Sequence, residues 1–440
     1  MEIIGIINWI IAIFFTVCYS YQMFYIAVSL AEKAPFLRWM FKKRHQKLTP
    51  TEIKKTRYGI LIAARNEEKV IGQLIDSIKA QDYPAELIDI FVMADNCTDS
   101  TKATAEAAGA IVYERFNKEL VGKGYALNLL LKNIARDFPE KHDAFLVFDA
   151  DNILEPNYIT EMNKTYSAGY EVATSYRNSK NYGDNWISSG YSLWFLRESR
   201  QLNGVRSVLR TSSEIKGTGF LIHKDIIKRQ GGWIHHLLIE DVQFTIENVL
   251  QGEKVAYCDT AILYDEQPTD FMTSWWQRKR WCRGYLQILK RYTFKLIGAF
   301  FKGKGFSNYD MLMAMSPAFF ISVAAVAVNI LGLILTLILD PHAFFGSLLS
   351  SVVLGAGSYL LFALVALITV LTENKRIHAT TWQKISSVLT FPIFMATYIP
   401  IAAASLFSGT DWKPIKHNRV DSDSKVSVPE HNEEKEMSNK

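Results

Sequence analysis

The sequence predicts an α/β protein whose globular domain is attached to membrane-spanning helices, and three observations predict it. Between residues 57 and 265, short apolar runs alternate with segments of helical periodicity, which is typical of a parallel sheet covered by helices. Four other stretches contain no Asp, Glu, Lys or Arg, and each exceeds the roughly 20 residues that cross a bilayer. Hydrophobic residues make up 49% of the chain, which is high for a fully soluble protein.

The first apolar stretch, from Ile3 to Ala31, is predicted to remain in the protein as a membrane anchor. It is longer than the apolar core of a signal peptide, and Met1 and Glu2 before it carry no positive charge. We therefore expect a transmembrane helix over residues 1–31. The segment at 32–56 is rich in Lys and Arg, so the positive-inside rule predicts a basic linker in the cytoplasm.

Three further apolar stretches lie near the C-terminus and predict about three membrane helices over residues 309–410. These stretches run over residues 311–339, 343–372 and 385–410. A polar tail at 411–440, which we expect to be disordered, follows them. The chain is thus predicted to be a multi-pass protein of the cell membrane with its globular domain, residues 57–265, in the cytoplasm.

The side of the membrane on which the tail lies is left open by the sequence. Three crossings after a cytoplasmic domain would put the tail outside, whereas its basic residues Lys413, Lys416 and Arg419 favour the inside. Pro392 and Pro400 interrupt the last apolar stretch, so this stretch could re-enter the membrane instead of crossing it.

Within the domain, the apolar runs predict strands that alternate with helices. One face of the first predicted helix carries Val70, Leu74, Ile75 and Ile78, which is the spacing of a helix packed on a core. Strands are expected at 58–64, 87–94, 110–113 and 144–148, and helices at 67–80, directly after Asp99, and at 125–135.

Two carboxylates follow the predicted strand at 144–148, where open α/β sheets bind their ligands. Residues two apart in extended backbone project to the same side, so Asp149 and Asp151 could face one hard cation. The alternative is an Asp-rich turn without a ligand. Loops at 64–67, 95–99 and 122–124 are predicted at the same edge, and their Arg, Lys and carboxylate side chains suit a nucleoside diphosphate with its metal. Neither a GxGxxG sequence nor a P-loop is present.

Two later segments also contain residues that could bind a ligand or take part in catalysis. Gly217-Thr218-Gly219 precedes an apolar run, so it could be a bulged strand or a place where a ligand approaches the backbone closely. Glu240 and Asp241 precede a helical pattern that ends at Gly252. Carboxylates there are usually caps, but the field of a helix N-terminus would also keep Asp241 ionised, as a general base must be.

A basic and aromatic segment, which begins at Trp275, precedes the C-terminal apolar stretches. Such mixing can indicate nucleic-acid binding, but a long apolar stretch begins within about 20 residues, so an amphipathic segment at the membrane surface over 266–308 is expected instead. The net charge of +5 does not imply a nucleic-acid partner either. The four cysteines show no metal or disulfide spacing.

Taken together, four motifs resemble those of the membrane-embedded family 2 glycosyltransferases, the group that holds poly-N-acetylglucosamine, hyaluronan, chitin and cellulose synthases. The resemblance covers residues 57–285 and the flanking apolar stretches. Each motif alone is weak, whereas their order along the chain is specific. The motifs are Ala64-Arg65-Asn66-Glu67-Glu68, Asp149-Ala150-Asp151, Glu240-Asp241 and Gln277-Arg278-Lys279-Arg280-Trp281, which fits the pattern QxxRW.

The resemblance implies a GT-A fold, a UDP-sugar donor and Mg²⁺ or Mn²⁺ as cofactor. Asp151, with Asp149, would hold the metal, and Asp241, next to Glu240, would take the proton of the acceptor hydroxyl. One base without a second nucleophile implies inversion at the sugar. The residues expected around the UDP are Arg65, Glu67, Asp95, Lys123 and Asp149, and those expected around the diphosphate and acceptor are Gln277, Arg280, Trp281, Gly217 and Thr218.

The resemblance predicts transfer from a donor such as UDP-N-acetylglucosamine or UDP-glucose to a growing β-linked polysaccharide. An alternative is addition of one sugar to a lipid, because ceramide glucosyltransferases carry a similar terminal motif. A transporter or scaffold with an inactive domain is a third alternative. The predicted spans argue against it, because they contain no charged residue, and such residues usually mark an ion or substrate path. Four spans are few for a polymer channel, so export would need a partner protein or an oligomer.

Overall fold

The apolar runs of the domain form one eight-stranded sheet in the computed structural model, which describes residues 2–34, 50, 52–315 and 317–407. The strands occur in the order β3-β2-β1-β4-β7-β6-β8-β5 across the sheet. They are β1 (Tyr58–Ala64), β2 (Ile88–Asp95), β3 (Ile111–Arg115), β4 (Ala144–Asp149), β5 (Ile153–Leu154), β6 (Val172–Ser179), β7 (Phe220–His223) and β8 (Val255–Asp265).

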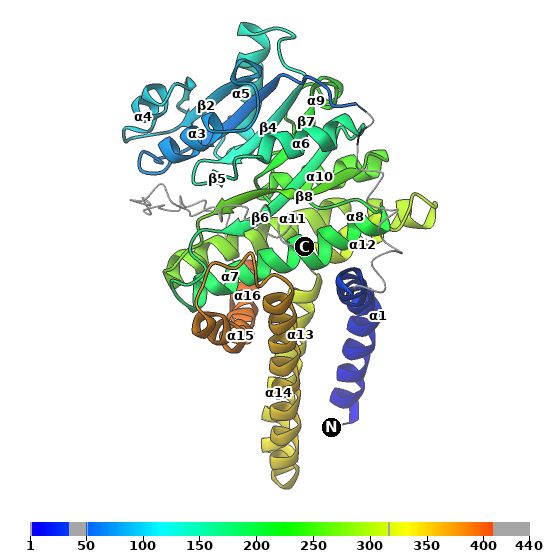
Figure 1. The fold of residues 1–440 in the computed structure, drawn as a ribbon. Coiled ribbons are helices and arrows are strands. Elements are labelled where there is room, and N and C mark those ends of the chain that lie inside the picture. Colours follow the sequence, from blue (N-terminus) through cyan, green and yellow to red (C-terminus); the bar gives the residue numbers. More distant parts are fainter. Residues whose placement is uncertain (1, 35–49, 51, 316, 408–440) are drawn as a thin grey trace, which may run out of the picture.

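The predicted parallel sheet is found in one half of the observed sheet. Strands β3, β2, β1 and β4 are all parallel, so the segments that follow β1, β2 and β4 meet at one edge. The other half is mixed, because β7 runs antiparallel to both β4 and β6, and β5 runs antiparallel to β8. The chain between β6 and β7 passes below the sheet instead of crossing its face, so β7 can return in the opposite direction (Figure 1).

Helices cover both faces of the sheet, as the alternating pattern predicts. On one face, α3, α4 and α6 pack on a core that includes Ile60, Leu74 and Phe148. On the other face, α5, α9 and α10 pack on a core that includes Phe91, Leu130 and Phe244. These helices are α3 (Ile71–Lys79), α4 (Thr101–Ala107), α5 (Lys123–Asp137), α6 (Tyr158–Ser167), α9 (Lys224–Gln230) and α10 (Glu240–Gln251), with a 3₁₀ turn at Ala85–Leu87.

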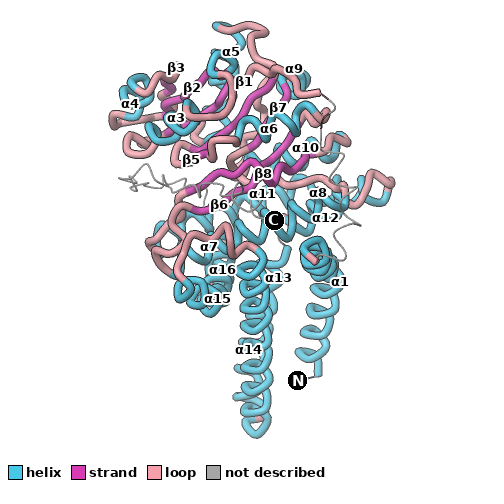
Figure 2. Tube along the Cα trace, viewed as in Figure 1, coloured by secondary structure: helices cyan, strands magenta, loops and turns pink. Residues whose placement is uncertain are grey.

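A further set of helices lies between the sheet and the membrane helices (Figure 2). We call this set the base layer, and its longest member is α11, which carries the QxxRW motif. The layer contains α7 (Trp186–Arg197), a π-helical turn (Glu198–Asn203), α8 (Gly204–Leu209), α11 (Phe271–Phe301) and α12 (Ser307–Ala314).

Four helical segments are long and apolar enough to cross a membrane, which supports membrane association of the chain. They cover Gly5–Glu32, Ala318–Leu339, Pro341–Thr372 and Thr381–Leu406. The helices themselves are α1 (Glu2–Lys33), α13 (Pro317–Leu339), α14 (Pro341–Thr372), α15 (Thr381–Ala396) and α16 (Tyr398–Leu406). Helices α1, α13 and α14 extend away from the domain in Figure 1.

Two predicted boundaries in this part of the chain change. The apolar stretch predicted from residue 311 begins inside α12, where Met311 and Met313 are buried in a cluster with residues of α1, α10 and α11, and the candidate span starts only at Ala318. The last stretch is divided into α15 and α16, because Pro400 cannot donate a backbone hydrogen bond to the carbonyl of Ala396 and so prevents a continuous helix. The predicted linker is largely outside the described residues, and the predicted tail lies wholly outside them.

Candidate active site

One cavity lies at the sheet edge where the carboxyl ends of β1, β2 and β4 meet. Its walls also include the N-termini of α5 and α10 and one side of α11. Of the residues singled out in the sequence, all except Thr218 line this cavity. They are Arg65, Glu67, Asp95, Lys123, Asp149, Asp151, Gly217, Glu240, Asp241, Gln277, Arg280 and Trp281.

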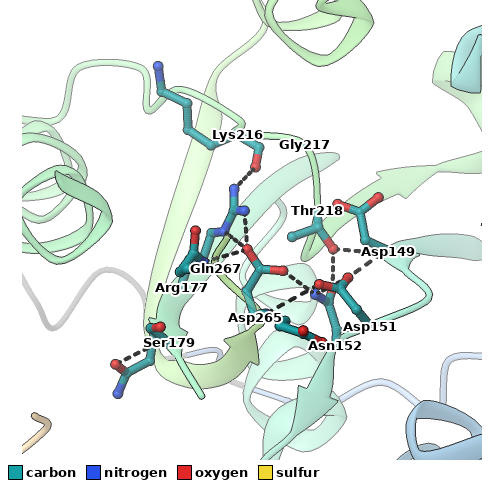
Figure 3. Close-up of polar contacts among 12 residues, drawn as sticks. Asp149, Asp151, Asn152, Arg177, Ser179, Lys216, Gly217, Thr218, Asp265 and Gln267 are labelled. Carbon is teal, nitrogen blue, oxygen red and sulfur yellow. Dashed lines mark hydrogen bonds and ion pairs between the residues drawn. The ribbon is translucent and has the colours of Figure 1, made fainter. Parts of the chain in front are cut away.

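Thr218 instead supports the loop at the end of β4 from behind. Its hydroxyl oxygen accepts a hydrogen bond from the backbone N–H of Asp149 at 3.0 Å, and its O–H donates to the side chain of Asn152. Asn152 in turn donates to Asp265 Oδ1 at 3.0 Å. This buried network, drawn in Figure 3, orients the two aspartates toward the cavity rather than contacting a ligand there.

Three carboxylates gather at the ends of β4 and β8. Asp151 is only 4% exposed, and its Oδ2 accepts a hydrogen bond from the backbone N–H of Glu266 at 3.2 Å. Burial, together with the negative charges of Asp265 and Asp149, raises the pKa of Asp151 well above its ordinary value. Asp265 is compensated by Arg177, whose Nε donates to it at 2.9 Å (Figure 3).

This arrangement fits a divalent cation that is held only partly by the protein. The like charges around Asp151 would be offset by a cation between it and Asp149, both of which line the cavity. Among the described residues, no group of three or more His, Cys, Asp and Glu side chains could hold a metal ion. Two carboxylates would thus leave coordination positions for water and for phosphate oxygens of a substrate, as Mg²⁺ sites commonly do.

Lys123 links the same carboxylates to the Gly217 loop. Its ammonium group donates to Asp149 Oδ1 and, at 2.7 Å, to the carbonyl oxygen of Gly217. Gly217 has φ of 82°, a conformation that favours glycine, and its Cα lies beside Asp149. Lys123 is the first residue of α5. The helix N-terminus and the charge of the lysine both favour a bound anion there.

One end of the cavity is formed by the ends of β1 and β2. Asp95 is buried and pairs with Arg115 at 2.6 Å. Burial outweighs this pairing, so the pKa of Asp95 is raised. Glycine is required at position 124 for close packing of α5 against the backbone of His235, because a Cβ atom there would lie 2.0 Å from the carbonyl oxygen of His235.

Glu240 and Asp241 occupy the first turn of α10 and face the cavity. Burial, reinforced by the charge of Asp241, raises the pKa of Glu240 to about 7. Burial also raises the pKa of Asp241, although the backbone N–H of Val242 acts in the opposite direction. The helix N-terminus therefore only partly compensates burial, which leaves Asp241 more basic than an exposed aspartate.

The QxxRW residues approach the cavity from α11. Trp281 packs edge-on against Tyr191 and Phe195, with ring centroids 5.8 and 6.2 Å apart. Gln277 and Arg280 line the cavity beside it, whereas Arg278 points away and is fully buried. Of the five residues of the motif, α11 thus presents Gln277, Arg280 and Trp281 to the cavity, while Arg278 is buried away from it.

Several cavity residues were not predicted from the sequence. Arg177 and Asp265 come from the ends of β6 and β8, and the apolar run that ends at Asp265 could have indicated the latter. The membrane end of the cavity is lined by aromatic side chains and one carboxylate that belong to no recognisable motif. They are Trp194, Phe195, Glu198, Tyr285, Phe319 and Tyr398.

Comparison with known protein families decides what this domain is. The family described as "Glycosyltransferase like family 2" matches residues 56–284, more than half of the chain. The chain belongs to this family. Its α/β domain is therefore the GT-A domain of a family 2 glycosyltransferase, as its motifs predict.

Among curated proteins, this family 2 glycosyltransferase is similar to "Probable glycosyltransferase YdaM" of Bacillus subtilis. The two are 28% identical over 277 residues, which cover 56% of this chain and 58% of that protein. It is also 25% identical to the "Beta-monoglucosyldiacylglycerol synthase" of Nostoc sp. over 61% of this chain and 57% of that protein. The chain thus matches somewhat more than half the length of these relatives.

Among solved structures, the fold is similar to a mannosyltransferase from Pyrobaculum calidifontis, determined in complex with GDP-Man and Mn²⁺. The TM-score is 0.55 at 13% identity, and the match covers 91% of this chain and 99% of that one. At this identity, the likeness concerns the fold of the family 2 glycosyltransferase, including helices beyond its GT-A domain.

Proposed function

We propose that this protein transfers a hexosyl group, with inversion, from a nucleoside diphosphate sugar to a hydroxyl of a membrane-held acceptor. One observation carries the proposal. A single cavity begins at the nucleotide end, beside Asp95, and reaches Phe319 and Tyr398, which lie in the first turns of α13 and α16. Donor chemistry and the membrane surface therefore meet in one space.

The chemical step needs a base, and support for an anionic leaving group. Asp241 accepts the proton of the acceptor hydroxyl, whose oxygen forms a bond to the anomeric carbon. The bond from that carbon to the diphosphate breaks, and the nucleoside diphosphate leaves with the electron pair. Arg280 and Lys123, which line the same cavity, stabilise the charge that it gains.

A divalent cation would contribute Lewis-acid stabilisation of the diphosphate at Asp149 and Asp151. The fit of these residues supports Mg²⁺ or Mn²⁺, and the structurally similar mannosyltransferase was determined in complex with Mn²⁺. We propose UDP as the carrier of the sugar, on the resemblance of the four motifs to those of UDP-sugar enzymes. GDP, which carries the mannose in the complex of that mannosyltransferase, is the competing carrier.

The acceptor that we favour is a membrane-anchored molecule to which the enzyme adds a single sugar, in contrast to a growing polysaccharide. In α1, α13 and α14, only 17%, 11% and 11% of the residues in the apolar 18-residue window are buried, which favours an acceptor at the membrane surface over a polymer enclosed by these described helices. The name of the Nostoc relative also describes transfer to a lipid. A growing β-linked polysaccharide is the second candidate, supported by the aromatic platform of Trp281 beside the acceptor end.

The test is transfer by the full chain in lipid nanodiscs with labelled UDP- and GDP-sugars. Label should enter a lipid-soluble product with one donor, and a sizing gel separates short glycolipids from polymer. Asp241→Asn should lower kcat by about 100-fold or more, because the amide cannot accept the proton, while donor affinity is kept. Transfer at the normal rate by this variant would contradict the mechanism, and a long product would establish the second candidate.

A further inference from the structure

The membrane end of the cavity contains a carboxylate whose presence the transfer chemistry does not explain. Glu198 is 6% exposed and lines the cavity. It is the first residue of the π-helical turn that follows α7, and such turns are frequent at functional sites. Trp194 and Phe195, four and three residues before it, line the same cavity.

The two oxygens of this carboxylate differ in their surroundings. Glu198 Oε1 lies 3.3 Å from the ammonium group of Lys216. Glu198 Oε2 is buried and accepts no hydrogen bond within the described part of the chain. A buried acceptor without a donor costs free energy, so a donor from a ligand would be strongly favoured there.

Lys216 cannot turn freely to serve that oxygen. Its ammonium group also lies 2.7 Å from Glu214, a fully buried carboxylate. Figure 3 shows its side chain extending away from Asp149 and Asp151, while its carbonyl oxygen accepts a hydrogen bond from Arg177 at 2.8 Å. The lysine is thus held between two carboxylates and pairs with only one oxygen of Glu198.

Aromatic rings surround this end of the cavity. Trp194 stacks near Phe319 and Tyr398, with ring centroids 6.2 and 6.1 Å away, and these two rings stack on each other at 4.4 Å. Aromatic faces pack well on the C–H faces of a pyranose, whose hydroxyls then point to the sides, where a carboxylate can receive them. This combination of rings and one hydrogen-bond acceptor is suited to a sugar.

The charges at this end disfavour an anionic acceptor. Glu198, Glu240 and Asp241 all line the cavity. The positive charge of Lys216 is shared between Glu198 and Glu214. Arg280 and Lys123, which also line the cavity, are assigned to the diphosphate of the donor, so an uncharged hydroxyl group fits among these carboxylates better than a second phosphate group.

We propose that Glu198 binds a hydroxyl of an uncharged sugar at the end of the acceptor, so that the acceptor is already glycosylated. This inference rests on the proposed function and specifies its acceptor. The sugar presents one hydroxyl to Asp241 and a second to Glu198, with its ring against the aromatic side chains. An acceptor that carries a single hydroxyl, such as diacylglycerol, satisfies only Asp241.

The test compares acceptors in phosphatidylcholine nanodiscs that contain the full chain. The probes are diacylglycerol, monoglucosyl- and monogalactosyl-diacylglycerol, and polyprenyl phosphate. At least one of the two glycosylated lipids should have a kcat/KM about 10- to 100-fold above that of diacylglycerol and of polyprenyl phosphate. The difference corresponds to one hydrogen bond to a buried charged group. Glu198→Gln should raise KM for this acceptor about 10-fold while donor affinity stays normal, and Glu253→Gln, outside the cavity, is the control.

The outcomes separate this inference from the proposed function. Equal or better use of diacylglycerol or polyprenyl phosphate by the unaltered protein would overturn the sugar subsite and leave the proposed function intact. An unchanged KM in a folded Glu198→Gln variant would likewise overturn it. If no donor sugar is transferred to any acceptor, then the proposed function fails first.

Discussion

At the residue scale, the site concentrates negative charge that the protein leaves only partly compensated. Arg177 neutralises Asp265, and Lys123 neutralises Asp149. Asp151 is the more buried of the two carboxylates proposed to bind the metal. Its pKa is raised by burial and by the negative charges of Asp265 and Asp149. A divalent cation would relieve this repulsion, so metal and donor should bind together.

Asp151→Asn should therefore weaken metal-dependent donor binding and abolish most transfer. The amide keeps the size of the side chain, but it removes the charge that would hold the cation. Isothermal titration of nucleoside diphosphate with and without Mn²⁺ measures the effect, and Asp225→Asn, on the exposed surface, serves as the control. Full activity of the unaltered protein in excess EDTA would rule out the metal.

The acid limb of the pH profile should report Glu240 and Asp241. As pH falls through about 7, Glu240 takes up a proton, and further acid protonates Asp241, so kcat/KM should decline below neutral pH. Glu240→Gln removes the group with the pKa of about 7 and should move the limb to lower pH. An acid limb that stays in place in this variant would assign it to another group.

At the element scale, α11 is fixed to the break between α15 and α16 by a buried cation. Arg278 has no exposed surface and donates to Thr397 Oγ1 at 2.7 Å and to the carbonyl oxygen of Phe394 at 3.3 Å. Its guanidinium lies 4.4 and 4.9 Å from the ring centroids of Phe394 and Tyr398. The interruption of the helix thus provides the acceptors that hold the QxxRW helix in place.

Arg278→Met should lower both transfer and the unfolding temperature in detergent. Methionine fills much of the same space, but it leaves the Thr397 hydroxyl oxygen without this donor and the Phe394 carbonyl with only the Thr397 hydroxyl as a side-chain donor, at a cost of about 1–3 kcal/mol. Arg278→Lys should restore part of both properties. Lys279→Met is the matched control, because the neighbouring ammonium only covers the exposed ring of Trp276; an equal effect of both methionine variants would contradict this role.

At the scale of the whole molecule, the loop between α14 and α15 joins the membrane helices to the sheet. The Tyr176 hydroxyl donates to Glu373 at 2.7 Å, and the Asn178 side chain donates to the carbonyl oxygen of Arg376 at 2.9 Å. This loop must therefore lie on the same side of the membrane as the GT-A domain. The turn between α13 and α14, at Asp340, lies at the opposite end of these helices (Figure 1).

Cysteine labelling of intact cells should reveal this topology. In a Cys97→Ser background, His342→Cys should react with an impermeant reagent from outside, and Lys375→Cys should be protected. We propose that α15 and α16 re-enter the membrane, so Ser427→Cys in the tail should also be protected. Labelling at Ser427 would show a crossing, and labelling at Lys375 would reverse the orientation of the domain.

The sequence alone predicts an α/β domain, the candidate spans and the motif residues that line the cavity. Alternating apolar runs, charge-free stretches and short motifs are local properties of the chain, and parallel strands bring the ends of β1, β2 and β4 together whatever follows them. For this reason Asp95 and Asp151 could be predicted to share a site although they are far apart along the chain, whereas Asp241 was assigned to that site by the resemblance of its motif.

The other residues that line the cavity are brought there by contacts between segments that are far apart in the sequence. The antiparallel course of β7, the place of Thr218 behind the cavity and the approach of Trp194, Glu198 and Tyr398 depend on contacts between distant segments. None of these follows from a period or a motif. A buried oxygen without a donor, such as Glu198 Oε2, exists only once all the surrounding groups have been placed.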